Sequence, residues 1–397
     1  MDLQQRTVKS MNRENVLNYL LLSPQGRTQQ ELAQHSLLTI ASIGNILSEL
    51  QEKKLIEKSG LALSSGGRKP SIYKLDQSHY RIFSVSIGYG TLTCLLVSLQ
   101  GNVLAKDLLT FDLEDDPYQV LDHMITTFYS ICESQMVSFD QILGVGISAP
   151  GPLDEEHGII LNPPNLTGWI NVKITQYLHE RIPLLIQLEK DANCTMMCEY
   201  YYGIARNSMN ALYVMVDAGI GSGILVEGEV YKGATQVAGE IGHGTIDLNG
   251  LKCNCGNYGC LEVMASGNAI VRKALTEVRK GCPTTIAHID NNLGLEEVLD
   301  AALQGDDLCL SLLQDSSRYV GIKLADKINF LNPELVILGG RINDKLEQYT
   351  GWVKETALSR IFQETARGVQ IKRAKFGDIS EGLGAATVVL KEAFKQQ

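Results

Sequence analysis

Beyond residue 80, short apolar stretches alternate with helical stretches along most of the chain. Apolar runs bounded by glycine or polar turns are typical of buried strands, and their alternation with helices indicates α/β layers. The pattern therefore predicts two α/β lobes. The first series is IFSVSIG, TLTCLLVSL, NVLAKDLLTF, a helical stretch after Pro117, and QILGVGISAP, and the second is LLIQLEK, ALYVMVD, GSGILVEG and ELVILGG.

The first eighty residues have a different pattern, with helical periodicity. Residues 8–22 predict a helix whose apolar stripe includes Met11, and Thr28 with Glu31 forms a capping-box signature for a second, short helix. A third helix is expected from about Thr39, with Ile43, Ile46, Leu47 and Leu50 on its buried face. The second and third helices are short and joined by a tight turn, and the third is polar on its outer face. This pattern predicts a helix-turn-helix. Its expected DNA-facing residues are Thr39, Ser42 and Asn45.

Two strand-like runs, LIEKSGLAL and SIYKLD, follow around SSGGRKP and predict a wing. Arg68 and Lys69 at its tip are suited to DNA phosphates or a narrow minor groove. Gly44 costs roughly 1 kcal/mol inside the third helix relative to alanine, and close approach to DNA is one reason to accept that cost. The same elements could instead form a protein-interaction module.

Composition and charge limit the class of protein. The 397 residues are 44% hydrophobic and 20% charged, which is ordinary for a globular protein long enough for two or three domains. Neither a long apolar run nor an apolar signal core is present, so we expect a cytoplasmic protein without membrane contact. The net charge is −10, with +3 on residues 1–80 and −13 on the remainder. A mildly basic head on an acidic body is compatible with a nucleic-acid-binding module.

Three of the nine cysteines lie close together beside a histidine. Nine residues separate His243 from Cys253, one separates Cys253 from Cys255, and four separate Cys255 from Cys260. Three thiolates and an imidazole make a closed tetrahedral zinc set that leaves no position for water. The spacing therefore predicts a structural zinc site, the alternative being four unrelated residues. Glycine-rich turns at residues 86–91 and 216–223 further suggest a cleft for a nucleotide or sugar.

The body resembles the ROK family, named for repressors, open reading frames and sugar kinases. The resemblance is carried, in order along the body, by GVGISAPGPLD, NPPNLTGW, EKDANCTMMCEYYYG, GEIGH, CNCGNYGCLE and NPELVILGG. The head, with VKSMNRENVLNYL and SSGGRKP, resembles those of the family's repressors, whereas its kinases lack one. The resemblance implies an actin- or hexokinase-like body of two lobes. The expected domains are 1–80, 81–190 completed by the helix 381–397, and 191–380.

The resemblance also implies a sugar site. Asp191 matches the catalytic base of the kinases, which removes a proton from the attacking hydroxyl. Glu240 lies three residues before His243, so on a helix the two would share a face. Lys190 stands where the kinases usually have asparagine; it could pair with a carboxylate or phosphate on the sugar, or turn outward. The expected sugar-binding residues are Gly151, Asn165, Lys190, Asp191, Glu240, His243 and Glu262.

The first glycine-rich turn departs from the kinase pattern Asp-x-Gly-Gly-Thr. It reads SIGYGT, with Ser86 at the aspartate position and Tyr89 at the second glycine, so we expect weak ATP binding or none. The sequence thus predicts a sugar-responsive transcriptional repressor that is not an enzyme and binds operator DNA as a homodimer or homotetramer. The alternatives are a sugar kinase with an added DNA-binding head and a regulator controlled by a protein partner.

Overall fold

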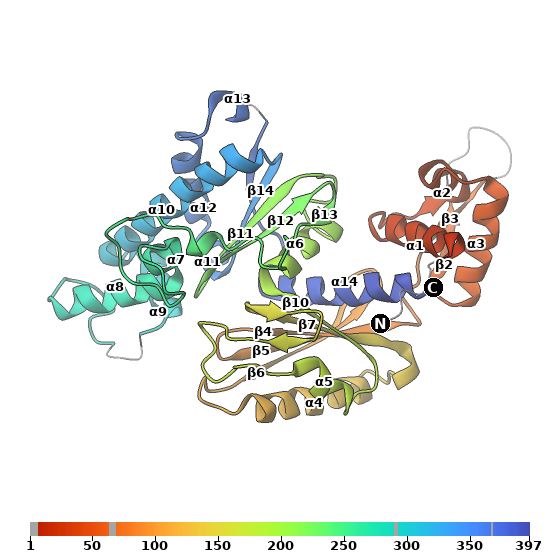
Figure 1. Ribbon diagram of the computed structural model, residues 1–397, viewed down its shortest axis with the longest axis horizontal. Coiled ribbons are helices and arrows are strands. Elements are labelled where there is room, and N and C mark those ends of the chain that lie inside the picture. The colour runs from red at the N-terminus through yellow and green to blue at the C-terminus, as the bar shows by residue number, and fades with distance from the viewer. Residues whose placement is uncertain (1–6, 63–68, 290–292, 367) are drawn as a thin grey trace.

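The computed structural model describes residues 7–62, 69–289, 293–366 and 368–397 (Figure 1). Its head is a three-helix unit with a three-stranded antiparallel sheet of order β1-β3-β2. The capping box predicted at Thr28 and Glu31 is present, with each side chain accepting a hydrogen bond from the other residue's backbone N–H. The elements of the head are α1 (Val8–Leu21), β1 (Arg27–Thr28), α2 (Gln29–Ser36), α3 (Ile40–Glu52), β2 (Ile56–Leu61) and β3 (Ser71–Leu75).

Two details of the head differ from the sequence-based expectation. Met11 is 49% exposed rather than part of the buried stripe of α1. It lies nine residues before Leu20, which is two and a half helical turns, so the two side chains leave opposite sides of the helix. A side chain at Gly44 would come within 2.9 Å of the amide nitrogen of Gln29. This atom is the end of a flexible side chain, so the contact between α2 and α3 favours glycine here only weakly.

The body contains two five-stranded sheets that repeat one topology. Their strand orders are β10-β7-β4-β5-β6 and β13-β12-β11-β14-β15. Each begins along the chain with an antiparallel meander of three strands. A fourth strand then pairs in parallel with the first strand of the meander, and a fifth pairs in parallel with the fourth. The eight strands predicted for the body are all present, five in the first sheet, where LLIQLEK forms β10, and three in the second. The strands are β4 (Arg81–Ile87), β5 (Thr91–Ser98), β6 (Val103–Thr110), β7 (Ile142–Ala149), β10 (Leu185–Lys190), β11 (Ala211–Val216), β12 (Ile220–Val226), β13 (Glu229–Val230), β14 (Leu335–Gly339) and β15 (Gln370–Arg373), with a small separate sheet of β8 (Leu153–Asp154) and β9 (Ile159–Ile160).

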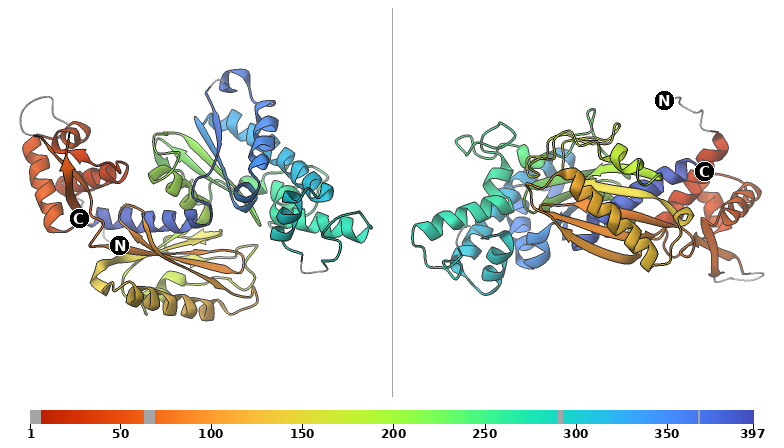
Figure 2. Two further views of the ribbon diagram at one scale, coloured as in Figure 1. Left: turned by 180° about the vertical axis from the view of Figure 1, so that it is seen from behind. Right: turned by 90° about the horizontal axis from the view of Figure 1, so that it is seen from below.

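Helices form the remaining layers. We call the sheet of β4 with α4 and α5 the first lobe, and the sheet of β11 with α7 to α13 the second lobe. The helices α6 and α14 pack against each other between the two sheets, while α4 covers the opposite face of the first sheet (Figures 1 and 2). The expected division of the chain at residues 80 and 190 stays a prediction. The helices of the body are α4 (Pro117–Ser134), α5 (Ile174–His179), α6 (Asp191–Tyr201), α7 (Leu261–Ala265), α8 (Gly267–Arg279), α9 (Leu295–Leu303), α10 (Asp307–Leu331), α11 (Arg341–Lys345), α12 (Glu347–Leu358), α13 (Gln363–Ala366) and α14 (Ser380–Lys395).

One apolar core joins the head to the layer between the lobes. The buried face of α1 belongs to the same cluster of contacting side chains as Tyr202 and the buried residues of α14, including Phe394. The hydroxyl of Ser10 in α1 also donates a hydrogen bond of 3.4 Å to the carbonyl of Lys395. The head is therefore packed onto the ends of α6 and α14. Among the described residues, no helix is long and apolar enough to cross a membrane.

Candidate functional site

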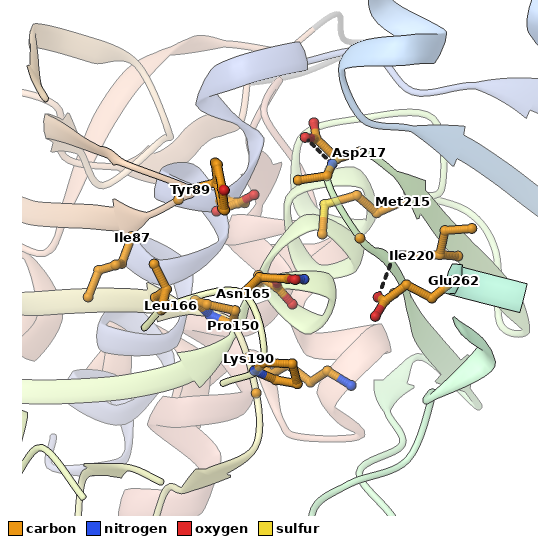
Figure 3. A pocket seen from close by; sticks show the side chains of 18 of the residues that line it. Ile87, Tyr89, Pro150, Asn165, Leu166, Lys190, Met215, Asp217, Ile220 and Glu262 are labelled. Carbon is orange, nitrogen blue, oxygen red and sulfur yellow. Dashed lines mark hydrogen bonds between the residues drawn. The ribbon is translucent and has the colours of Figure 1, made fainter. Parts of the chain in front are cut away.

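A pocket opens between the two lobes, at the carboxyl ends of several strands (Figure 3). In α/β sheets, ligand sites form at this edge because the loops after the strands meet there. All seven residues expected to bind sugar line this pocket: Gly151, Asn165, Lys190, Asp191, Glu240, His243 and Glu262. Their assignment to a sugar stays a prediction.

The parallel pairing of β7 with β10 explains how the first-lobe residues meet. Ala149 at the end of β7 lies opposite Lys190 at the end of β10, so the Gly151 loop and the start of α6 are neighbours. In the second lobe, Gly219 in the turn after β11 lets side chains of the pocket approach the backbone. A side chain there would come within 2.7 Å of the Glu262 carboxylate and 3.1 Å of the Asn165 amide nitrogen. The glycine of this turn thus leaves room for two polar side chains to face the pocket.

Asp191 is the first residue of α6, and its carboxylate accepts a hydrogen bond of 2.6 Å from the backbone N–H of Ala192. Burial raises the pKa of Asp191 to about 6, against the opposing charge of Lys190, and the carboxylates of Glu240 and Glu262 act in the same direction as burial. A carboxylate of this kind accepts a hydroxyl proton more readily than an ordinary aspartate would.

Lys190 does not turn outward. Its side chain is only 8% exposed, and its ammonium donates a hydrogen bond to the Glu240 carboxylate and a longer one of 3.5 Å to the carbonyl of Ala238. Lys190 ends β10 of the first lobe, whereas Glu240 belongs to the second, so this ion pair crosses the cleft. The expected helix shared by Glu240 and His243 is absent, because Glu240 only precedes a single 3₁₀ turn, Ile241–His243.

The histidine and cysteines predicted to bind metal come together beside the pocket. The ligand atoms of His243, Cys253, Cys255 and Cys260 all lie within 4.8 Å of one another. The Cys255 and Cys260 sulfurs are 3.7 Å apart, as are the Cys253 sulfur and His243 Nδ1. A disulfide would require about 2.05 Å between sulfurs, whereas neighbouring ligands of a tetrahedral ion with metal–sulfur bonds of about 2.3 Å lie about 3.8 Å apart. The cluster therefore has the dimensions of a metal site.

Two acidic residues of the pocket, Asp217 and Glu381, escaped the analysis of the sequence. Asp217 follows β11 and accepts hydrogen bonds from the backbone N–H and guanidinium of Arg341; although burial opposes them, these bonds lower the pKa of Asp217. Glu381 reaches the pocket from the first turn of α14. Burial, with the charges of Asp191 and Asp217, raises the pKa of Glu381 to about 8. The turn after β11 was a usable signal for Asp217, but nothing near residue 381 in the sequence marks a pocket.

The departure from the kinase turn is also visible at the pocket. Ile87, Gly88 and Tyr89 of the first glycine-rich turn line it, and the ring of Tyr89 is half-exposed at its edge (Figure 3). Ser86, at the position of the kinase aspartate, is 6% exposed. A buried hydroxyl cannot supply the charge with which a carboxylate helps to hold magnesium.

The residues expected to face DNA lie on the surface of the head. Thr39 caps α3, and its hydroxyl accepts a hydrogen bond of 3.1 Å from the backbone N–H of Ser42. The side chains of Thr39, Ser42 and Asn45 are exposed on one side of α3, opposite its apolar face. Lys69 is exposed just before β3, whereas Arg68 lies outside the described residues. Contact with DNA stays a prediction for all five.

Known proteins resemble the whole chain, head included. The xylose repressor of Bacillus subtilis (strain 168) is 26% identical over 392 residues, which cover 98% of each chain. A crystal structure of a ROK family transcriptional regulator, a homologue of the Escherichia coli MLC protein, superposes with a TM-score of 0.81 at 26% identity and covers 98% of this chain and 97% of the regulator.

A kinase resembles the body alone. The ROK hexokinase of Thermus thermophilus is 27% identical with a TM-score of 0.62, and 96% of it corresponds to 77% of this chain. The family model described as "ROK family" likewise matches residues 82–392, which is the body without the head. A match over this share of the chain shows that the protein belongs to the ROK family.

Proposed function

We propose that this protein is a sugar-responsive transcriptional repressor that binds operator DNA through its head and a sugar in the pocket between its lobes. The main support for the proposal is that one chain contains both the head and the ROK body. The relatives that match it from end to end are named repressors or transcriptional regulators, whereas the hexokinase matches the body only. An exposed polar face on α3 suits a recognition helix in the major groove.

Two helices provide a route from the pocket to the head. The first residue of α6, Asp191, lines the pocket, and Tyr202 directly after this helix belongs to the core that also contains α1. Near the start of α14, Glu381 lines the pocket, and Lys395 at its end accepts the hydrogen bond from Ser10. A sugar that favours one arrangement of the lobes would therefore move the head, because a ligand shifts an equilibrium only through its different affinity for the two states.

We assign zinc to the cluster of His243, Cys253, Cys255 and Cys260. Three thiolates with one imidazole favour zinc among the common divalent ions, and four protein ligands make the site structural. A bound ion of this kind supplies a crosslink and no open position for a reacting group. Glu240 lies three residues before His243, and Glu262 lies two residues after Cys260. Both carboxylates would therefore project from a loop that the bound ion holds in place.

A sugar kinase is the weaker alternative. Asp191 remains at the base position, but Ser86 lacks the carboxylate and Tyr89 adds a ring to the turn that would face phosphate. The proposed assignment is a non-enzymatic regulator in which Asp191 accepts a sugar hydroxyl.

The test is retention of genomic DNA. Purified protein is mixed with sheared genomic DNA at physiological salt, the retained fragments are sequenced, and sugars are then tested for releasing them. Enrichment of a palindromic site is expected, because a homodimer or homotetramer, as the sequence predicts, would present paired heads to two half-sites. Asn45→Ala is the variant that should weaken this enrichment. Uniform retention, equal for this variant, together with sugar-dependent ATP consumption that Asp191→Asn abolishes, would favour the kinase instead.

A further inference from the structure

The pocket carries an excess of negative charge that its one lysine does not offset. Among the described residues that line it, five are carboxylic acids and Lys190 is the single lysine or arginine. Asp217 is paired with Arg341, and Glu381 holds its proton near neutral pH because burial raises its pKa to about 8. Even so, Asp191, Glu240 and Glu262 leave three carboxylates facing one ammonium group.

Two groups that could attract an anion at this site already hold a carboxylate. The ammonium of Lys190 is buried against Glu240, so an incoming anion would have to displace a carboxylate from it. The N-terminus of α6 is the other site where an anion could bind, since the first backbone N–H groups of a helix attract negative charge. That position already holds the carboxylate of Asp191, which accepts from the N–H of Ala192. A phosphate at either position would compete with a carboxylate and would lie among the carboxylates of Asp191, Glu240 and Glu262.

From this arrangement we infer that Glu240, by occupying the ammonium of Lys190 across the cleft, makes the pocket select a sugar that is neither phosphorylated nor acidic. The inference rests on the proposed sugar-responsive function and specifies its ligand class. The hydroxyls of an uncharged sugar can donate to Asp191 and Glu262, and carboxylates are acceptors that such donors satisfy without any added charge. Glu240 remains held by Lys190 while they do so.

The experiment compares matched sugars by calorimetry with the purified full chain at pH 7.5. The pairs are glucose with glucose 6-phosphate and glucuronate, N-acetylglucosamine with its 6-phosphate, mannose with its 6-phosphate, and xylose with xylonate. For whichever pair binds, the uncharged member should bind at least tenfold more tightly. A phosphorylated or acidic member that binds as tightly or more tightly would overturn the inference and leave the repressor assignment intact.

Two matched variants test the part played by Lys190. Glu240→Gln and Glu262→Gln each remove one negative charge from the pocket, but only Glu240→Gln releases the ammonium of Lys190. The affinity ratio of anionic to uncharged sugar should rise tenfold or more in Glu240→Gln, and by clearly less in Glu262→Gln. Equal changes in both variants would show that total charge sets the preference and would refute the role of Lys190.

Two further outcomes are also decisive. If either variant fails to fold, judged by its circular dichroism and melting curve, the wild-type comparison alone decides the ligand class. If no sugar in the panel binds while operator DNA is still retained, the inference falls together with the sugar-responsive part of the proposed function, and a protein partner becomes the regulator to seek.

Discussion

Replacing Gly384 by alanine should destabilise the body, because α14 passes close to the backbone of α6 at Gly384. A side-chain carbon there would lie 1.9 Å from the carbonyl oxygen of Cys194 and 2.3 Å from its carbonyl carbon. Non-bonded carbon and oxygen atoms need more than about 3 Å, so the helices would have to separate by roughly 1 Å. Overpacking of this kind costs about 3 kcal/mol when backbone has to move, and the better helix propensity of alanine returns about 1 kcal/mol.

The expected net loss is therefore about 2 kcal/mol, or a fall of roughly 4 °C in Tm for a cooperative unit of this size. Differential scanning calorimetry measures it, with Gly351→Ala as the control. Gly351 lies in α12, and no described atom beyond its chain neighbours and its own helix backbone lies within 4 Å of the position that a side chain would take, so alanine there should stabilise by up to about 1 kcal/mol. The shift should also weaken sugar binding, since Asp191 and Glu381 lie three residues before Cys194 and Gly384. Equal Tm values for the two variants would refute the close approach of α6 and α14.

Three further predictions concern metal, pH and DNA. Cys255→Ser should remove bound zinc, measured by mass spectrometry of the purified protein, whereas Cys282→Ser outside the cluster should retain it; zinc in both variants would contradict the ligand set. The pKa of Glu381 is raised to about 8, so the folded state holds a proton that the unfolded chain has lost, and stability should fall as pH rises from about 5 to 8. Glu381→Gln should flatten this part of the Tm–pH curve, and an unchanged slope would count against the buried carboxyl. Asn45→Ala should cost about 1–3 kcal/mol of operator affinity at fixed salt if Asn45 contacts a base, and an unaltered Kd would exclude that contact.

Local signals in the sequence were sufficient for the secondary structure of the parts that position the site. The ten predicted strands, eight in the body and two in the head, and the three helices of the head are present, because each apolar run or capping box depends on neighbouring residues alone. Met11 shows the limit of this reasoning. It is apolar and belongs to the same helix as the buried residues, but it lies two and a half turns from Leu20 and therefore faces outward.

Motif spacing was equally informative for the metal cluster. His243 and the three cysteines lie within eighteen positions, and short loops can bring such residues together without help from distant parts of the chain. Lys190 was different. The sequence left its direction open, because the partner that decides it, Glu240, is fifty residues away and belongs to the other lobe.

The sequence by itself therefore determined the pattern of head and body, the strands, the residues of the histidine and cysteine cluster and the family to which the chain belongs, since all of these depend on local pattern or on motifs in a fixed order. Only the tertiary structure decided which charges meet in the pocket and what connects it to the head. Glu381 joins Asp191, and Lys190 neutralises Glu240, because the lobes fold against each other and α14 returns from the end of the chain to lie between them. Electrostatic interactions of this kind depend on distance in space, which separation along the sequence does not reveal.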